Sequence, residues 1–207
     1  VSGQIPVSYL RDGFCSAALA SYQQFLIEHQ HTKAQLEIFE SYRGAESELP
    51  LKLERKLNYP KWLIEGLDPK EGRDVIRAVK TRLNQKTFSQ IVFKNYNSTC
   101  CVTGLDIPKV NRASHIIGWA DPRGKKIRLD PRNGLCLSAT YDAAFDKHLI
   151  SLDDDKRIIL SKEIKEHYTS ASVQTYFRSK EGDRIILPDH YGPKAEYLAH
   201  HRSKGSF

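Results

Sequence analysis

The chain has 207 residues, of which 40% are hydrophobic and 28% are charged, and this is an ordinary composition for a globular protein. No apolar run approaches the roughly 20 residues that a membrane-spanning helix needs, and the first residues show no secretory signal pattern. Membrane proteins are therefore excluded as a class, and the net charge of +7 raises the question of an acidic partner.

The positive charge is concentrated in the middle of the chain. Residues 61–133 hold fifteen Lys and Arg against seven Asp and Glu, whereas residues 1–60 hold six against seven. Residues 134–207 hold eleven of each sign. A basic block of this kind suits a polyanion such as nucleic acid, but charge alone favours this no more than a solvated surface.

The first part of the chain is predicted to be helical. Residues 8–43 carry two apolar stripes at helical spacing, which predict core packing and consist of Leu19, Tyr22 and Leu26 with Phe25 beside them, then Leu36, Phe39 and Tyr42. Residues 44–68 form a charged connector with two prolines, where a domain boundary is expected. The stretch from Pro69 to Tyr96 is interpreted as a basic helix pair.

The pattern changes after residue 100. Residues 109–119 are strand-like, and residues 121–134 form a polar loop that is long enough to suggest a function. Residues 135–148 are expected to contain a short helix, and residues 149–161 a hairpin that turns at Asp153–Asp155. The last residues, with His200 and His201, are interpreted as a mobile basic tail.

The cysteines give no metal or disulfide pattern. Cys15, Cys100, Cys101 and Cys136 contain no C-x-x-C pair, and a vicinal pair is a poor corner for a tetrahedral zinc site. We therefore expect reduced, mostly buried thiols in a cytoplasmic protein, without structural zinc.

Three residues of the second half could carry chemistry. His115 lies in a predicted strand, where a lone histidine is more often structural than catalytic. Asp142 and Asp146 share one helix face at spacing i, i+4, about 6 Å apart at Cβ, and a divalent cation would relieve their repulsion. Taken alone, the pair is more often explained by Asp146 as a helix cap and Asp142 as a solvated carboxylate than by a metal site.

Together, these segments resemble the HNH endonuclease family. The ordered motifs are "CVTG", "ASHIIGW", "NGLCLS" and "DAAFDKHLIS", preceded by the run "TFSQIVFKNYNSTC", and they cover about residues 81–161. Each motif is weak by itself, but the ordered set is specific. The resemblance implies a two-stranded hairpin followed by a helix that holds one metal, the ββα-metal core.

The resemblance also assigns roles to individual residues. It implies that His115 is the general base, that Asn133 braces the loop and orients the histidine, and that Asp142 and Asp146 hold the metal. Ser114 departs from the pattern, because the family often has an acidic or histidine ligand at that position. A neutral hydroxyl is a weak ligand, so modest metal affinity is expected.

The remaining candidates are assigned from charge and position. Six basic side chains around the histidine are expected to contact DNA phosphates: Arg112, Arg123, Lys125, Lys126, Arg128 and Arg132. Trp119 is interpreted as covering the hairpin, with stacking on a base as the alternative. His148 is interpreted as a surface or capping residue, with a role at the metal as the alternative.

These observations predict an α+β protein. A helical N-terminal region (1–67) precedes an HNH nuclease domain (68–207, core about 100–161) with a C-terminal extension. The expected function is a DNA endonuclease that uses Mg²⁺ or Mn²⁺, of a bacterial restriction or defence type. The alternative is a non-catalytic nucleic-acid-binding or interaction module on a decayed HNH scaffold. The hypothesis for the N-terminal helices is a dimerisation or target-selection element, and in the first case the protein would be a homodimer.

Overall fold

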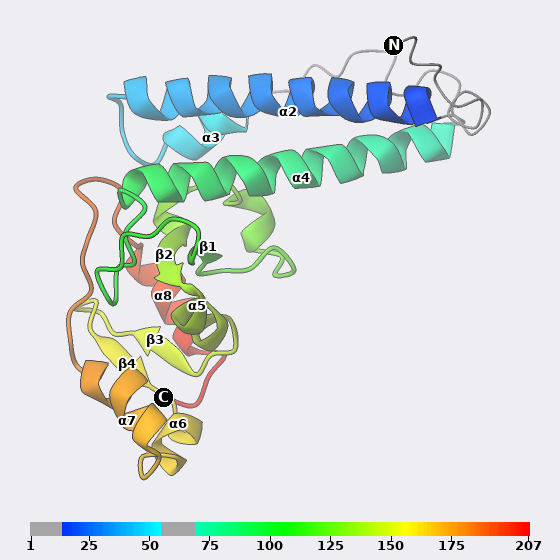
Figure 1. Cartoon of the computed structure of the whole chain (residues 1–207). Coiled ribbons are helices and arrows are strands. Elements are labelled where there is room, and N and C mark those ends of the chain that lie inside the picture. The colour runs from blue at the N-terminus through cyan, green and yellow to red at the C-terminus, as the bar shows by residue number, and fades with distance from the viewer. Residues whose placement is uncertain (1–13, 55–68) are drawn as a thin grey trace, which may run out of the picture.

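The computed structural model describes residues 14–54 and 69–207, and its elements are shown in Figure 1. The expected domain border at residues 67 and 68 lies outside these ranges, as do residues 8–13 of the predicted N-terminal helix. None of the described helices is long and apolar enough to cross a membrane.

Two long helices run side by side across one end of the molecule (Figure 1). They are α2 (Phe14–Ser41) and α4 (Pro69–Asn95), with the short helix α3 (Leu49–Leu53) beside them. Ion pairs join Glu28 to Arg82 at 3.7 Å and Glu40 to Lys94 at 2.8 Å. In both pairs the two residues are the same number of positions apart in the sequence. The helices α2 and α4 therefore run in the same direction.

The stretch that was interpreted as a helix pair is a single helix, so that prediction was wrong. Beyond Gly72, α4 contains no glycine or proline, and nothing in its sequence ends the helix before Asn95. Its buried side chains, including Val79, Leu83 and Ile91, follow a helical period along one continuous face.

Beneath α4 lies a ββα unit. The strand β1 (Asn111–His115) pairs antiparallel with β2 (Gly134–Ser138), with His115 opposite Gly134, and α5 (Ala139–Asp146) follows directly. The predicted α+β class is therefore confirmed. Gly134 lets β2 approach α4 closely, since a Cβ atom there would stand 2.4 Å from Cγ2 of Val92.

The rest of the chain extends this unit. A second hairpin, β3 (Ile150–Leu152) with β4 (Ile158–Leu160), matches the predicted hairpin and its acidic turn. It is followed by α6 (Lys162–Glu166), α7 (Ala171–Tyr176) and α8 (Ala195–Arg202). The short 3₁₀ turns are η2 (Gly124–Lys126), η3 (Pro131–Asn133) and η4 (Arg178–Lys180).

The C-terminal residues are not a mobile tail, contrary to the sequence interpretation. Leu198 is fully buried, and the His201 ring stacks on Phe145 of α5 with 3.8 Å between centroids. His201 also binds Ser151 Oγ through Nδ1 at 2.8 Å and the Phe145 carbonyl through Nε2 at 3.0 Å. These contacts hold α8 against α5 and β3.

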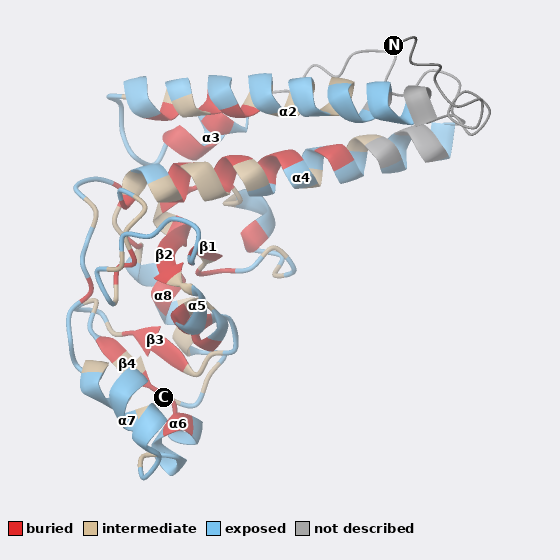
Figure 2. Cartoon of the chain, viewed as in Figure 1, coloured by how far each residue is buried: buried red, intermediate tan, exposed pale blue. Residues whose placement is uncertain are grey.

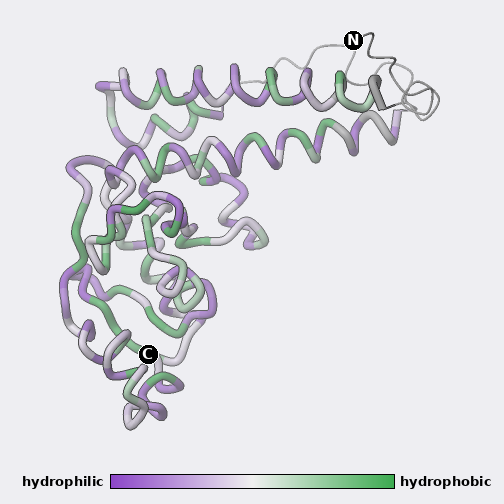
Figure 3. The backbone as a smooth tube through the Cα atoms, in the orientation of Figure 1, coloured by the Kyte–Doolittle hydropathy of each residue, from purple (hydrophilic) through white to green (hydrophobic). Residues whose placement is uncertain are grey.

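The two apolar stripes of α2 differ in how far they are buried. Phe39 is 8% exposed and packs in the core, as predicted, with Leu36 and Tyr42 partly buried beside it. The first stripe was wrongly predicted to be core, because Leu19 is 57% exposed and Tyr22 is 59% exposed. Figure 2 shows this half of α2 as exposed, and Figure 3 shows hydrophobic residues along it.

A single buried cluster joins the N-terminal helices to the ββα unit. Phe39, Leu49 and Leu53 belong to the same cluster as Phe88 of α4 and Leu135 of β2. The hydrophobic core therefore extends from α2 and α3 through α4 into the hairpin that carries His115.

Candidate active site

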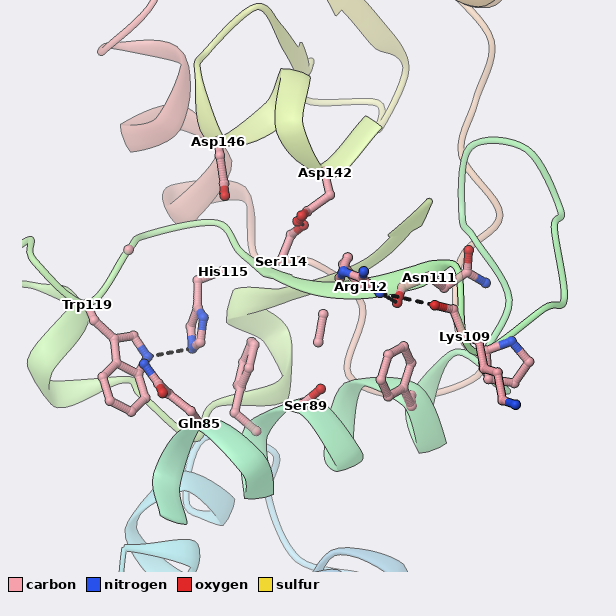
Figure 4. A pocket seen from close by; sticks show the side chains of 15 residues that line it. Gln85, Ser89, Lys109, Asn111, Arg112, Ser114, His115, Trp119, Asp142 and Asp146 are labelled. Atoms are coloured by element: carbon pink, nitrogen blue, oxygen red, sulfur yellow. Dashed lines mark hydrogen bonds between the residues drawn. The ribbon is translucent and has the colours of Figure 1, made fainter. Parts of the chain in front are cut away.

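A pocket of about 650 Å³ opens between α4, β1 and α5 (Figure 4). His115, Asp142 and Asp146 all line it, and Ser114, Arg112 and Trp119 complete its polar side. The structure thus brings three of the four residues assigned by the family resemblance to one cavity, and the fourth, Asn133, lies behind it.

Ser114 and His115 point to different sides of β1, because neighbouring strand residues alternate between the two faces. Figure 4 shows Ser114 directed at Asp142 of α5, where its hydroxyl hydrogen-bonds to the Asp142 carboxylate. The His115 ring lies toward α4 and stacks on Phe88, with 3.5 Å between centroids. The histidine and the carboxylates therefore approach the pocket from opposite sides of the strand.

The environment of His115 keeps its ring neutral. Burial against Phe88 lowers the pKa of His115 to about 4, and the nearby Arg128 carbonyl opposes this shift only in part. Its Nε2 atom lies 2.8 Å from the indole Nε1 of Trp119 and 3.3 Å from the Arg128 carbonyl oxygen. A neutral imidazole has one nitrogen with a free lone pair, which is what a general base needs.

Asp142 and Asp146 occupy successive turns of α5 and face the same pocket. Partial burial, followed by the charge of Asp142, raises the pKa of Asp146 above its usual value. Two carboxylates and the Ser114 hydroxyl form a set of hard oxygen donors, which suits Mg²⁺ or Mn²⁺. In the described parts of the chain, no group of three or more His, Cys, Asp or Glu side chains could hold a metal ion, so these two carboxylates would need water or phosphate oxygens to complete the coordination.

Asn133 is fully buried and closes the long loop against the end of β1. Its Oδ1 accepts from the Ile117 N–H at 2.9 Å, and its Nδ2 donates to the Ile117 carbonyl at 3.1 Å. The Ile116 N–H donates to the Asn133 carbonyl at 2.8 Å. This pairing fixes the backbone immediately after His115.

The six predicted DNA contacts divide into three groups: two residues near the pocket, three around η2, and one in an internal ion pair. Arg112 lines the pocket and donates only to main-chain carbonyls, so its positive charge has no carboxylate partner among the described contacts. Arg128 lies over the Trp119 ring, with its guanidinium carbon 5.2 Å from the ring centroid. Lys125 is exposed on η2, and Arg123 and Lys126 line a separate hollow with Tyr197.

Arg132 forms the third group, because its guanidinium is held by a buried partner. Its Nε and Nη2 donate to the two carboxylate oxygens of Asp130 at 3.0 Å and 2.8 Å, and its side chain is only 12% exposed. Tyr197 of α8 donates to the same carboxylate at 3.0 Å. Arg132 therefore forms an internal ion pair that ties the loop to α8, and its predicted contact with a DNA phosphate stays a prediction.

Two features of the site were not found from the sequence. Phe88 was only one member of a helical pattern, and its position under His115 follows from the packing of α4 on β1. Trp119 covers the histidine itself rather than the hairpin in general. His148 is half-buried next to the His201 ring, 4.4 Å away, and makes no described contact with the pocket.

The predicted cysteine state agrees with the structure where it is described. Cys100, Cys101 and Cys136 are free and buried, and burial raises the pKa of the Cys136 thiol to about 12. The side chain of Cys15 lies outside the described part of the structure.

Parts of the chain are similar to known proteins. Residues 100–153 match a family model described as HNH endonuclease. Among solved structures, the chain is similar to a modification-dependent TagI restriction endonuclease, at 16% identity and a TM-score of 0.41. The match covers 56% of this chain and 36% of that structure, so the chain spans about a third of its length. A search of curated proteins finds no match.

The family model begins at the buried Cys100 and ends in the hairpin turn after β3, so it contains β1, β2 and α5. His115, Asn133, Asp142 and Asp146 all fall inside it. The predicted HNH resemblance and the prediction of a nuclease are confirmed for this region: the chain carries an HNH endonuclease domain at residues 100–153.

Proposed function

We propose that the protein is a metal-dependent DNA endonuclease, with His115 as general base and one Mg²⁺ or Mn²⁺ ion on Asp142 and Asp146. The observation that carries this proposal is that the three side chains line one pocket inside the HNH domain. Hydrolysis of a phosphodiester needs an activated water and relief of charge on the departing oxygen, and this set of residues can supply both.

The protein's own groups have distinct tasks in this reaction. His115 takes the proton from the attacking water, and Nδ1 is its ring nitrogen without a described protein partner. Arg112 contacts the phosphate at the pocket edge. Asn133 holds the Ile117 backbone and with it the direction of the His115 ring. Asp142 and Asp146 would hold a divalent ion, and this ion would supply charge neutralisation at the phosphate and the leaving oxygen.

The proposal includes a wider biological role for the nuclease. A bacterial restriction or defence function, exercised in the cytoplasm, rests on the resemblance to the HNH branch described above and on the free thiols. Of the DNA contacts, we retain Arg112, Arg123, Lys125, Lys126 and Arg128, whose charges are not buried in an internal pair like that of Arg132.

The test is a plasmid-nicking assay with Mg²⁺ or Mn²⁺, with EDTA as the metal-free control. His115→Gln keeps a flat polar group over Phe88 and should reduce cleavage by roughly 10²–10⁴-fold, while DNA affinity in EDTA stays within a factor of about two. Cleavage by this variant within tenfold of wild type would reject His115 as the base. DNA binding by wild type without any metal-dependent cleavage would favour the non-catalytic alternative.

We further propose that the protein is a homodimer through the N-terminal half of α2. Leu19, Tyr22, Phe25 and Leu26 are 57%, 59%, 51% and 38% exposed. Residues 14–27 contain no Asp, Glu, Lys or Arg, which is unlike a solvated helix face.

A second copy of the chain is the occupant that fits this stripe. Two copies of a protein with net charge +7 repel each other, so burial of apolar area must outweigh that repulsion. The stripe has no charged residue of its own, and the nearest described cation, Lys86 of α4, lies over the Phe25 ring and is paired with Glu28. An isologous contact also needs one self-complementary patch, which an apolar helix face provides. In Figure 1, α2 lies on the side of α4 away from β1 and β2, so the pocket is left open.

Light scattering tests the dimer directly. Tyr22→Glu should convert a dimer to a monomer, whereas Tyr176→Glu, at 55% exposure on α7, should leave the dimer intact. A wild-type protein that is monomeric at micromolar concentration, or a dimer that survives Tyr22→Glu and Leu19→Glu together, would reject this interface.

A further inference from the structure

Two groups compete for one nitrogen of His115. The indole N–H of Trp119 reaches Nε2 at 2.8 Å, and the carbonyl oxygen of Arg128 lies 3.3 Å from the same atom. An indole nitrogen only donates and a carbonyl oxygen only accepts. Nε2 can satisfy Trp119 only when it carries no proton, and it can satisfy Arg128 only when it carries one.

The two contacts therefore select different forms of a neutral ring. With the indole bonded, the ring proton lies on Nδ1, which then cannot accept a proton from water. With the Arg128 carbonyl bonded, the proton lies on Nε2 and Nδ1 has a free lone pair. The shorter contact is the one to Trp119, so the described arrangement holds His115 in the form that is idle as a base at Nδ1.

We propose that Trp119 is a positioning residue that holds His115 in the Nδ1–H form until DNA binds, and that withdrawal of its indole transfers the ring proton to Nε2 and makes Nδ1 the base. The transfer passes through solvent: Nδ1 gives its proton to one water while Nε2 takes one from another, and the ring stays neutral throughout. The benefit of this control to catalysis rests on the proposed function. The position of the ring proton on His115 does not.

The surroundings of Trp119 show how DNA could withdraw it. The Arg128 guanidinium lies over the indole, 5.2 Å from the ring centroid. Its Nε atom is buried and has no hydrogen-bond partner in the described structure. A phosphate oxygen offers that donor group a stronger partner than an aromatic face, so a bound DNA backbone would draw Arg128 off the indole.

The backbone around Trp119 permits this movement within limits. Ile117 is held by Asn133 on one side, and Asp121 is held by His200 on the other, with Nε2 to Oδ2 at 2.8 Å. Between them, Gly118 is exposed, and a Cβ at that position would meet no atom within 4 Å. The Gly118 carbonyl accepts from the Asp121 N–H at 3.1 Å, so the indole would turn away by rotation of the Trp119 side chain while both ends of its segment stay in place.

Nitrogen NMR of the histidine rings tests the tautomer without any cleavage. Chemical shifts of ¹⁵N-labelled imidazole distinguish Nδ1–H from Nε2–H, and the signal lost in His115→Gln identifies His115. At neutral pH the free wild-type protein should show mainly Nδ1–H. Adding a DNA duplex in EDTA should shift His115 to Nε2–H.

Trp119→Phe is the decisive variant, because it keeps an aromatic ring and removes only the N–H donor. It should shift the tautomer ratio toward Nε2–H by roughly 2- to 10-fold without DNA, the size expected for one hydrogen bond. Phe93→Leu, which removes another ring from the same pocket wall, should leave the ratio unchanged.

The outcomes separate this inference from the proposed function. An Nε2–H ring in free wild-type protein, or a ratio that Trp119→Phe does not change, overturns the inference whether or not plasmid is cleaved. The expected shifts in a protein that fails to cut DNA would support the control of the ring by Trp119 and reject only the endonuclease proposal. If Trp119→Phe fails to fold, Trp119→His, whose ring keeps an N–H, should retain the Nδ1–H form, and loss of that form overturns the inference.

Discussion

At the residue scale, Asp142 and Asp146 repel each other across one turn of α5 in the absence of a cation. Partial burial and the neighbouring charge both raise the pKa of Asp146, whereas the Asp142 carboxylate accepts a hydrogen bond from Ser114. A bound divalent ion would relieve this repulsion, which is the reason for proposing the metal at these two carboxylates.

Asp146→Asn should therefore separate metal affinity from stability. Isothermal titration should show Mn²⁺ affinity reduced by about tenfold or more, because one of two carboxylates is lost. The melting temperature in EDTA should stay constant or rise, because the repulsion is lost too. Asp155→Asn, exposed in the β3–β4 turn, is the control and should change neither quantity. Unchanged Mn²⁺ affinity in both Asp146→Asn and Asp142→Asn would place the metal elsewhere.

Asn133 acts on the same site through the backbone. Asn133→Ala leaves the buried N–H and carbonyl of Ile117 without their partners, and we expect the free energy of unfolding to fall by about 2–4 kcal/mol. Cleavage should fall further than folding explains, because His115 loses its fixed direction. Urea denaturation followed by single-turnover cleavage of the folded fraction measures both effects. A variant with wild-type cleavage per folded molecule would limit Asn133 to a structural role.

At the element scale, α8 supports α5, the helix that carries Asp142 and Asp146. His201 stacks on Phe145, between the positions of Asp142 and Asp146, and also binds Ser151 of β3. Asp130, Arg132 and Tyr197 join the same helix to the loop that ends at Asn133. The C-terminal extension therefore supports both α5 and the loop that ends at Asn133.

The buried state of His201 makes this support sensitive to pH. Burial lowers the pKa of His201 from 6.5 to about 4, so between these values the unfolded chain binds a proton that the folded chain does not. The stability from the neutral ring is complete above about pH 6.5 and is lost as the pH falls toward 4, by roughly 3 kcal/mol at most. His115, whose pKa is also lowered to about 4, adds loss in the same window.

Denaturation at pH 7.5 and pH 4.5 measures this dependence. His201→Asn should be less stable than wild type at pH 7.5, and it should lose less stability between the two pH values. The exposed His190 supplies the control, since His190→Asn should keep the wild-type slope. Equal slopes in all three proteins would show that protonation of His201 does not oppose folding.

At the scale of the whole molecule, the N-terminal helices share their core with the nuclease domain. Leu49 and Leu53 are 0% and 1% exposed and lie in one cluster with Phe88, the residue beneath His115. The sequence suggested that residues 1–67 form a separate region. The described packing favours one cooperative unit instead, in which α3 and α4 together support the active site.

A pair of substitutions on α3 tests this unity. Leu53→Ala should lower the free energy of unfolding of the whole chain by about 2–4 kcal/mol, because it opens a cavity in the shared core. Leu51→Ala, two residues away and 72% exposed, should cost less than about 0.5 kcal/mol. Urea denaturation monitored at the nuclease domain should show one transition that Leu53→Ala shifts. A nuclease transition that stays in place would establish an independent N-terminal domain.

The sequence by itself determined the features that depend on short separations along the chain. Asp142 and Asp146 share a face because they are four residues apart on a helix. The hairpin turn at Asp153–Asp155 and the strand at His115 likewise follow from local pattern, and the ordered motifs pointed to the HNH domain.

Only the tertiary structure decided the contacts between distant segments. Whether the stripe at Leu19 and Tyr22 faces the core depends on where α4 lies, and both stripes of α2 have the same helical period in sequence. In the sequence, His201 looks like part of a basic tail, but in the structure α8 places its ring on Phe145. The proton position on His115 depends on Trp119 and Arg128, which reach one atom only after the loop has folded back. Packing brings each side chain to one partner among many of similar chemistry. The periodicity of the sequence does not show which partner that is.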